Sequence, residues 1–235
     1  MKYSGVPSGF ARLDNITNGW QKGDMIVLAA RPSVGKSALS LAFALNAAKT
    51  GKSVAFFSLE MPANQLVERM LSTVGHVPME MIRKMDFNNG RAKNEMIKFE
   101  DATRKLSRYN IYIDDTPGAR LIDIQAKARK LKAEKEDLCL IVIDYIGIVT
   151  LGNSKITDRQ QIVAEISRGI KSLARELEVP IIALSQLSRD IEKRKTDSKA
   201  PMLSDIRDSG AIEQDADVII FIQREDRLGA GGKDA

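Results

Sequence analysis

A lysine and a hydroxyl residue, Lys36 and Ser37, stand between two apolar runs in the segment "VLAARPSVGKSALSLAFALNAA". The stretch "ARPSVGKS" (30–37) matches the phosphate-binding pattern G-x-x-x-x-G-K-[ST], with alanine in place of the first glycine. Gly35 permits a tight turn whose backbone N–H groups surround phosphate oxygens, and the N-terminus of the next helix adds partial positive charge. Lys36 is expected to reach the β- and γ-phosphates and Ser37 to ligate Mg²⁺. The residues predicted to bind the cofactor are Arg31, Pro32, Ser33, Val34, Gly35, Lys36, Ser37 and Ala38.

Three polar residues at the ends of other apolar runs supply the further groups that phosphate chemistry needs. Asp144 ends "LCLIVID", where a carboxylate is costly unless it has a function, and it is expected to hold Mg²⁺ through water. Glu60, in "FFSLEM", is our candidate base that orients the attacking water. Gln186 comes just after "PIIALS", where its amide can sense the γ-phosphate. The alternative for Asp144 is an aspartate that only starts a turn, and for Glu60 an acid near a helix N-terminus.

The scaffold that positions these residues is indicated by short β-branched runs that alternate with helical patterns. Runs that are apolar on both faces, separated by amphipathic helices, are typical of parallel sheets. The sequence therefore predicts an α/β fold with a mostly parallel central sheet and helices on both faces. Strands are expected at 25–30, 53–59, 111–114, 138–144, 180–185 and 218–223. Helices are expected at 37–48, 62–74, 94–108, 121–135 and 159–178.

The composition is that of an ordinary globular protein. Apolar residues make up 43% of the 235 positions and charged residues 29%, which argues against disorder. No apolar run approaches the ~18 residues that span a bilayer, and the start has no signal-peptide core, so we expect a cytoplasmic protein without a membrane partner. The single cysteine, Cys139, is expected to be buried and inert. The net charge of +5 favours a polyanionic partner.

The motifs "ARPSVGKS", "FSLEM", "IVIDY", "ALSQLSR" and "SDIRDSGAIEQDAD", in this order, resemble those of the DnaB family of replicative hexameric DNA helicases. The resemblance covers nearly the whole chain, and alanine at position 30 is usual in that family. It implies a RecA-like P-loop NTPase fold with ATP and Mg²⁺ as cofactors. It also implies a homo-oligomer, a hexameric ring around single-stranded DNA in the full-length protein, with a primase and a helicase loader as partners.

The resemblance implies the roles already given for the phosphate loop, the two acids and the glutamine, and it adds two groups of residues. Arg69, in "LVERML", matches a family arginine near the nucleotide phosphates; the alternative is an arginine on a helix surface. Arg207, Asp208 and Gly210 match the family loop that contacts the DNA backbone. Backbone N–H groups and one arginine suit phosphate contacts that ignore sequence, as a translocating motor requires.

The chain departs from the family pattern at three places. Asp208 stands where glutamate is usual, and Gly147 stands where the family continues "DY" with leucine and glutamine. The segment K-x-R-x-G-P-x-G, whose arginine finger completes the site of the adjacent subunit, is not found after "VIIFIQ". We therefore expect residues 1–235 to form a single RecA-like ATPase domain, without the finger segment or the N-terminal primase-interacting domain, that hydrolyses ATP slowly by itself.

Two other functions share some of these motifs. A recombination or repair ATPase of the RecA/RadA type has the phosphate loop and the "GFxxLD" pattern, but "FSLEM" and "SDIRDSGAIEQDAD" favour the helicase. A non-catalytic nucleotide-binding partner that loads a helicase would not need both Glu60 and Asp144.

Overall fold

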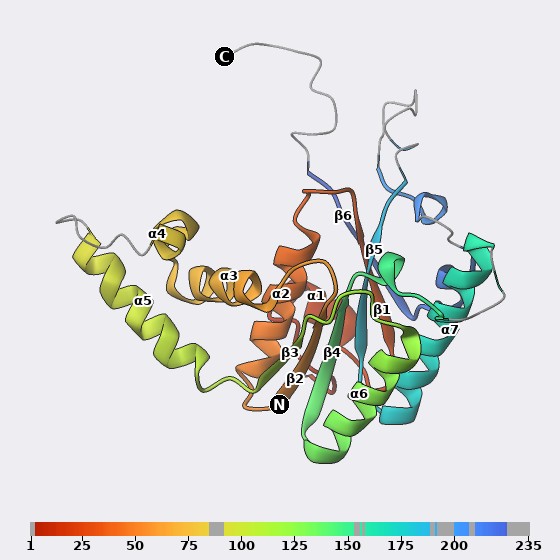
Figure 1. The fold of residues 1–235 in the computed structure, drawn as a ribbon, viewed down its shortest axis with the longest axis horizontal. Coiled ribbons are helices and arrows are strands. Elements are labelled where there is room, and N and C mark those ends of the chain that lie inside the picture. Colours follow the sequence, from red (N-terminus) through yellow and green to blue (C-terminus); the bar gives the residue numbers. More distant parts are fainter. Residues whose placement is uncertain are drawn as a thin grey trace, which may run out of the picture.

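Six parallel strands form the central sheet of this computed structural model (Figure 1). The structure describes residues 3–84, 92–152, 156, 158–188, 191, 200–206 and 210–224. The strands are β1 (Met25–Ala30), β2 (Ser53–Ser58), β3 (Ile111–Asp114), β4 (Leu138–Asp144), β5 (Ile181–Gln186) and β6 (Val218–Ile222). Their order is β3-β2-β4-β5-β1-β6 and every neighbouring pair is parallel, which confirms the predicted α/β class.

The strands form where the sequence is apolar on both faces. All residues of β1, β2 and β4 are buried, whereas those of the edge strands β3 and β6 are half-buried. Each predicted strand is found within one residue of its expected bounds. One difference concerns the site: Gln186 was expected just after the strand, but it is the last residue of β5 and pairs with Ala30 of β1.

Helices connect the strands. The five predicted ones are found within two residues of their expected bounds: α2 (Lys36–Ala48), α3 (Ala63–Gly75), α5 (Ala92–Leu106), α6 (Leu121–Glu134) and α7 (Arg159–Leu177). Within the described ranges, three short helices were not predicted: α1 (Ala11–Thr17), α4 (Met79–Lys84) and α9 (Gly210–Asp215). Each has only six or seven residues, so a period of 3.6 cannot stand out from its sequence. The 3-10 turns η1 (Ile146–Ile148) and η2 (Leu203–Asp205) are likewise too short to be predicted from the periodicity of the sequence.

Helices cover both faces of the sheet, with α2 and α3 on one side and α6 and α7 on the other (Figure 1). The α2 side is closed by Trp20, which is 1% exposed and meets the Phe43 ring edge-on at 5.2 Å. Cys139 lies at the start of β4, where burial raises the pKa of its thiol to about 11, as expected for an inert cysteine. Among the described residues, no helix combines the length and the hydropathy that a membrane crossing requires.

Candidate nucleotide-binding site

The predicted site residues meet where β1, β2, β4 and β5 end. In open parallel sheets, ligands bind at the carboxyl ends of the strands, because the loops that follow them gather at one edge. A cavity of about 420 Å³ lies at this edge. Its lining includes every residue predicted to bind the cofactor except Val34, which is half-buried beside it, and it also includes Glu60, Gln186 and Arg69. Met61 lines the cavity too and was not predicted.

The phosphate loop joins β1 to α2 through two residues with positive φ, Ser33 at 60° and Gly35 at 117°. A Cβ at Gly35 would meet nothing within 4 Å, so glycine is needed there for its backbone conformation and not for space. α2 begins at Lys36, directly after Gly35. The first N–H groups of a helix have no acceptor within the helix, so the loop delivers free donors and partial positive charge to the cavity.

Asp144 lies beneath the loop, 1% exposed, and does not itself line the cavity. Burial raises the pKa of its carboxyl, while a hydrogen bond with the Ser37 hydroxyl and the charge of Lys36 act in the opposite direction. Its Oδ1 atom has no hydrogen-bond partner in the part of the chain that the structure describes. A buried carboxylate oxygen without a partner, next to a hydroxyl, is a donor set that suits Mg²⁺. These residues therefore fit the predicted metal.

Lys36 stands between two carboxylates and an aromatic ring. Burial lowers the pKa of its ammonium group, and the charges of Asp144 and Glu60 oppose that shift. Its Nζ atom lies 4.5 Å from the centroid of the Tyr145 ring. Sequence reasoning missed Tyr145: its position directly after Asp144 was visible, but nothing in the sequence indicated that its ring faces Lys36.

Glu60 is exposed and reaches the cavity from the turn after β2. The backbone N–H of Leu59 donates to the carbonyl of Asp144 at 2.8 Å, which ties the end of β2 to the end of β4 and keeps the two acids close. Arg69 comes from α3, and its Nε atom is buried without a hydrogen-bond partner among the described residues. Its charge acts on Asp144, so the helix-surface alternative for Arg69 is not supported.

Ile206, the residue directly before the segment predicted to contact DNA, lies near the same edge. Arg207 and Asp208 lie outside the described residues, and Gly210 is the first residue of α9. Leu187, directly after β5, forms an antiparallel bridge with Ile206. The described residue nearest to Arg207 in the chain is thus tied to the strand that carries the predicted γ-phosphate sensor.

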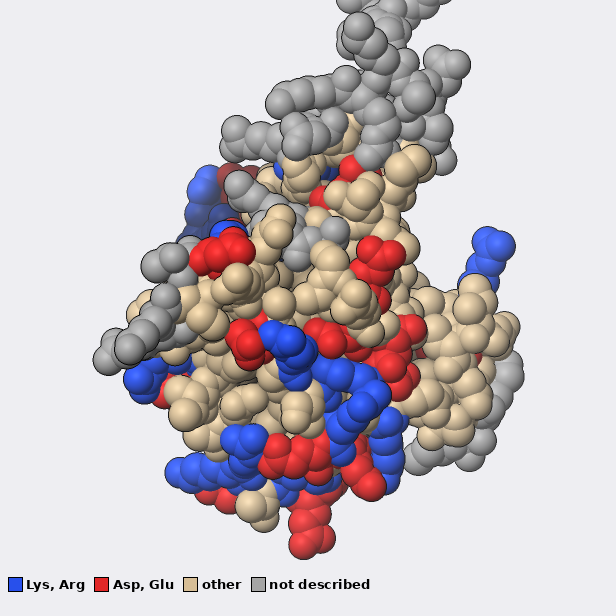
Figure 2. Space-filling view, turned by 90° about the vertical axis from the view of Figure 1, so that its right-hand side faces the viewer, with Lys and Arg blue, Asp and Glu red and all other residues tan. Residues whose placement is uncertain are grey.

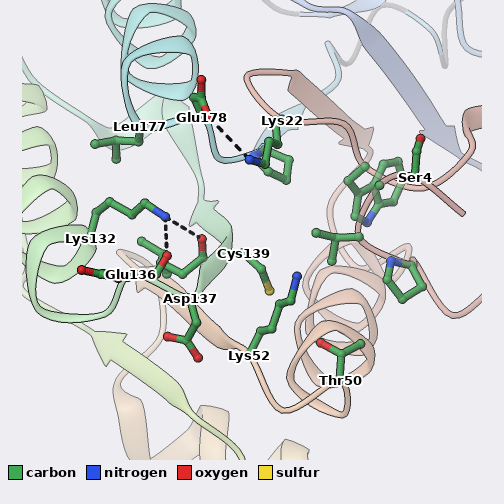
Figure 3. Close-up of a pocket in the computed structure, with 16 residues that line it drawn as sticks. Ser4, Lys22, Thr50, Lys52, Lys132, Glu136, Asp137, Cys139, Leu177 and Glu178 are labelled. Atoms are coloured by element: carbon green, nitrogen blue, oxygen red, sulfur yellow. Dashed lines mark hydrogen bonds and ion pairs between the residues drawn. The ribbon is translucent and has the colours of Figure 1, made fainter. Parts of the chain in front are cut away.

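A second cavity, of about 280 Å³, lies at the opposite edge of the sheet, where the strands begin (Figure 3). Lys132 there donates to the backbone carbonyl of Glu136 at 2.6 Å, and Lys22 pairs with Glu178 at 3.5 Å (Figure 3). Its three lysines are matched by three acidic residues, and no phosphate-loop pattern lines it. The cavity lined by the phosphate loop is therefore the better candidate for phosphate binding.

The side of the molecule covered by α6 and α7 carries basic and acidic side chains interspersed (Figure 2). Two examples are Arg129 with Glu176 at 2.7 Å and Arg168 with Glu165 at 2.6 Å. Charges paired in this way do not add up to a basic patch, so this side does not suit a polyanion.

Comparison with known proteins identifies the family. The profile described as "DnaB-like helicase C terminal domain" matches residues 5–234. The chain is 50% identical over 224 residues to the replicative DNA helicase DnaB of Geobacillus stearothermophilus, covering 95% of this chain and 48% of that protein. It is 42% identical to DnaB of Helicobacter pylori strain J99, covering 95% and 45%. The chain thus spans about half the length of the curated relatives it matches.

Solved structures agree with the sequence comparison. A structure whose title describes an ATPase domain has a TM-score of 0.88 and 37% identity, covering 96% of this chain and 78% of the other. A structure titled "The Structure Of A DnaB-Like Replicative Helicase And Its Interactions With Primase" also has a TM-score of 0.88 and 37% identity, covering 99% and 55%. With the RecA-like fold of these helicase ATPase domains and a family match over nearly its whole length, the chain belongs to the DnaB-like helicase C-terminal domain family.

Proposed function

We propose that this chain is an ATP-hydrolysing motor domain of a replicative DNA helicase. In this proposal, identical copies assemble around single-stranded DNA, ATP hydrolysis drives translocation, and a primase and a loader are partners. The observation that carries it is the meeting of Lys36, Ser37 and Glu60 at one cavity at the carboxyl edge of a parallel sheet, with Asp144 buried directly beneath the phosphate loop.

Each residue has a distinct task in hydrolysis. Lys36 and the N–H groups at the start of α2 bind the β- and γ-phosphates, and Ser37 and Asp144 would hold the metal. Mg²⁺, when bound with ATP, neutralises phosphate charge. Glu60 orients the attacking water and accepts its proton as the bond between the γ-phosphorus and the bridging oxygen breaks, which yields ADP and phosphate. Gln186 contacts the γ-phosphate at the end of β5.

The two other functions are less well supported. The relatives named above are replicative helicases, which favours a helicase over a recombination ATPase. A non-catalytic loader would need the phosphate loop only, whereas here a candidate base and a candidate metal ligand accompany it. Electron microscopy of the full-length protein with an ATP analogue and an oligonucleotide distinguishes the helicase from the recombination ATPase: closed rings are expected, and a helical filament along the DNA would favour recombination.

A pair of substitutions tests the site. Lys36→Ala is expected to abolish binding of a slowly hydrolysed ATP analogue in calorimetry, because Lys36 contacts the phosphates in the ground state. Glu60→Gln is expected to keep that binding and to lose at least about 100-fold in steady-state phosphate release, because Glu60 acts only as water attacks. Lys49→Ala is the matched control, since Lys49 lies at the far end of α2, bonded to Asn46.

The two variants also separate binding from catalysis. Wild-type affinity in the Lys36→Ala variant would contradict the assignment of the phosphate loop. Unchanged phosphate release by the Glu60→Gln variant would show that another group orients the water.

A further inference from the structure

We propose that Tyr145 is a positioning residue for the phosphate-binding lysine: its ring face holds the Lys36 ammonium at the cavity, and Gly147 leaves the space that the ring needs. The inference rests on the proposed ATP site and adds to it a residue that neither acts on water nor binds the metal.

The first step concerns Lys36, a long side chain that ends in a compact charge. Such a side chain has many accessible rotamers, so a partner that limits its conformations before phosphate binds lowers the entropy lost on binding. The Nζ atom of Lys36 lies 4.5 Å from the Tyr145 ring centroid, within the range of a cation–π interaction. The lysine and the tyrosine are both half-buried, and removal of water strengthens this attraction.

The second step concerns what fixes the ring. A Cβ added at Gly147 would lie 2.7 Å from Cε2 and 3.1 Å from Cδ2 of Tyr145. The ring therefore packs directly against the backbone of Gly147, in space that any other residue would fill. The carbonyl of Gly147 accepts a hydrogen bond from Nη2 of Arg159 at 2.6 Å, which holds that stretch of η1 in place.

The third step links this packing to the sequence. Gly147 lies in the middle of η1, two residues after Tyr145, so the sequence itself brings the glycine and the ring together. A side chain there would push the Tyr145 ring away from its present position. Glycine at position 147 therefore permits the place of the ring under Lys36, and we expect the effects of changing Tyr145 and Gly147 to depend on each other.

Binding of the Mg²⁺ complex of a slowly hydrolysed ATP analogue, measured by calorimetry, tests the role of the ring. Tyr145→Leu is expected to weaken binding about threefold to tenfold, because it removes the aromatic face. Tyr145→Phe keeps that face and should stay within about twofold of the wild type. Tyr112→Leu is the matched control: Tyr112 lies on β3, and its ring bears Lys135 at 5.7 Å, away from the cavity.

A second readout does not depend on nucleotide. Protons held over an aromatic face resonate upfield, so the ε-methylene signal of Lys36, followed with ¹³C-labelled lysine and assigned with Lys36→Arg, should be shifted upfield in the free protein. That shift is expected to persist in Tyr145→Phe and to vanish in Tyr145→Leu. Gly147→Ala should reduce it and weaken binding, and combining Gly147→Ala with Tyr145→Leu should add nothing to the effect of Tyr145→Leu alone.

Each outcome decides the inference. An ordinary Lys36 signal in the wild type, or equal analogue affinity in folded Tyr145→Leu and wild-type proteins, would overturn it while leaving the ATP site intact. Should Tyr145→Leu fail to fold, Gly147→Ala carries the same test: an unmoved signal and unchanged affinity would overturn the inference. A wild-type protein that does not bind the analogue would instead refute the proposed function, and the Lys36 signal would still report on the ring.

Discussion

The clearest prediction for stability concerns Lys171 and Asp217, which join α7 to the start of β6. The Lys171 ammonium donates to a carboxylate oxygen of Asp217 at 2.5 Å and to the carbonyl of Gly23 at 2.9 Å. The same carboxylate oxygen accepts the backbone N–H of Met25 at 2.7 Å. One carboxylate therefore fastens α7, β1 and β6 at the edge opposite the nucleotide cavity.

Replacement of Asp217 by alanine removes the two hydrogen bonds that its carboxylate accepts, one from Lys171 and one from the N–H of Met25. The Lys171 side chain is only 11% exposed and keeps its hydrogen bond to Gly23 and the attraction of the nearby Asp24 charge, while Met25, fully buried, loses the carboxylate that accepts its N–H. A charge-assisted bond contributes about 1.5–3 kcal/mol and an unmet buried donor costs about 1–3 kcal/mol. Asp217 is itself 34% exposed, so water offsets part of this loss and we expect about 3 kcal/mol in total. For a chain of this size that corresponds to a fall in Tm of about 6–12 °C.

Thermal unfolding followed by circular dichroism measures the effect. Asp217→Asn keeps an acceptor for Met25 and removes only the charge, so about half the fall is expected. Glu80→Gln is the control, because Glu80 and Lys84 form a pair at 2.6 Å with side chains 76% and 66% exposed, worth at most about 0.5 kcal/mol. If Asp217→Ala lowers Tm no more than Glu80→Gln does, the contacts of Asp217 with Lys171 and Met25 do not stabilise the fold.

Two further predictions concern DNA and the thiol. Arg207→Ala should weaken binding of single-stranded DNA equally for unrelated sequences. It should also reduce the slope of log affinity against log salt by about 0.7 for each phosphate that the arginine neutralises, measured by fluorescence anisotropy at several salt concentrations. Weaker binding of one sequence only would exclude a backbone contact. The raised pKa keeps the buried Cys139 thiol protonated at pH 8, so it should resist a disulfide reagent in the folded protein and react fully in denaturant, whereas rapid labelling of the native chain would contradict its burial.

The sequence alone predicts most of the scaffold and the chemistry of the phosphate loop. Strands buried on both faces must be apolar throughout, so runs such as the one that forms β4 stand out without any knowledge of their neighbours. The turn at Gly35 needs a residue that accepts positive φ, and an aspartate at the end of an apolar strand signals a function because its burial is costly. These constraints are local, so each can be recognised from a few consecutive residues of the sequence.

The tertiary structure decides how groups far apart in the chain meet. Lys36 and Tyr145 are separated by more than a hundred residues, and only the sheet order, which places β4 near β1, brings ring and ammonium together. Lys171 and Asp217 likewise meet only because α7 and the start of β6 lie at the same edge. Such contacts depend on strand order and side-chain packing. Hydrophobic periodicity indicates which residues are buried and in which kind of element, but it does not indicate which distant residue each one will contact.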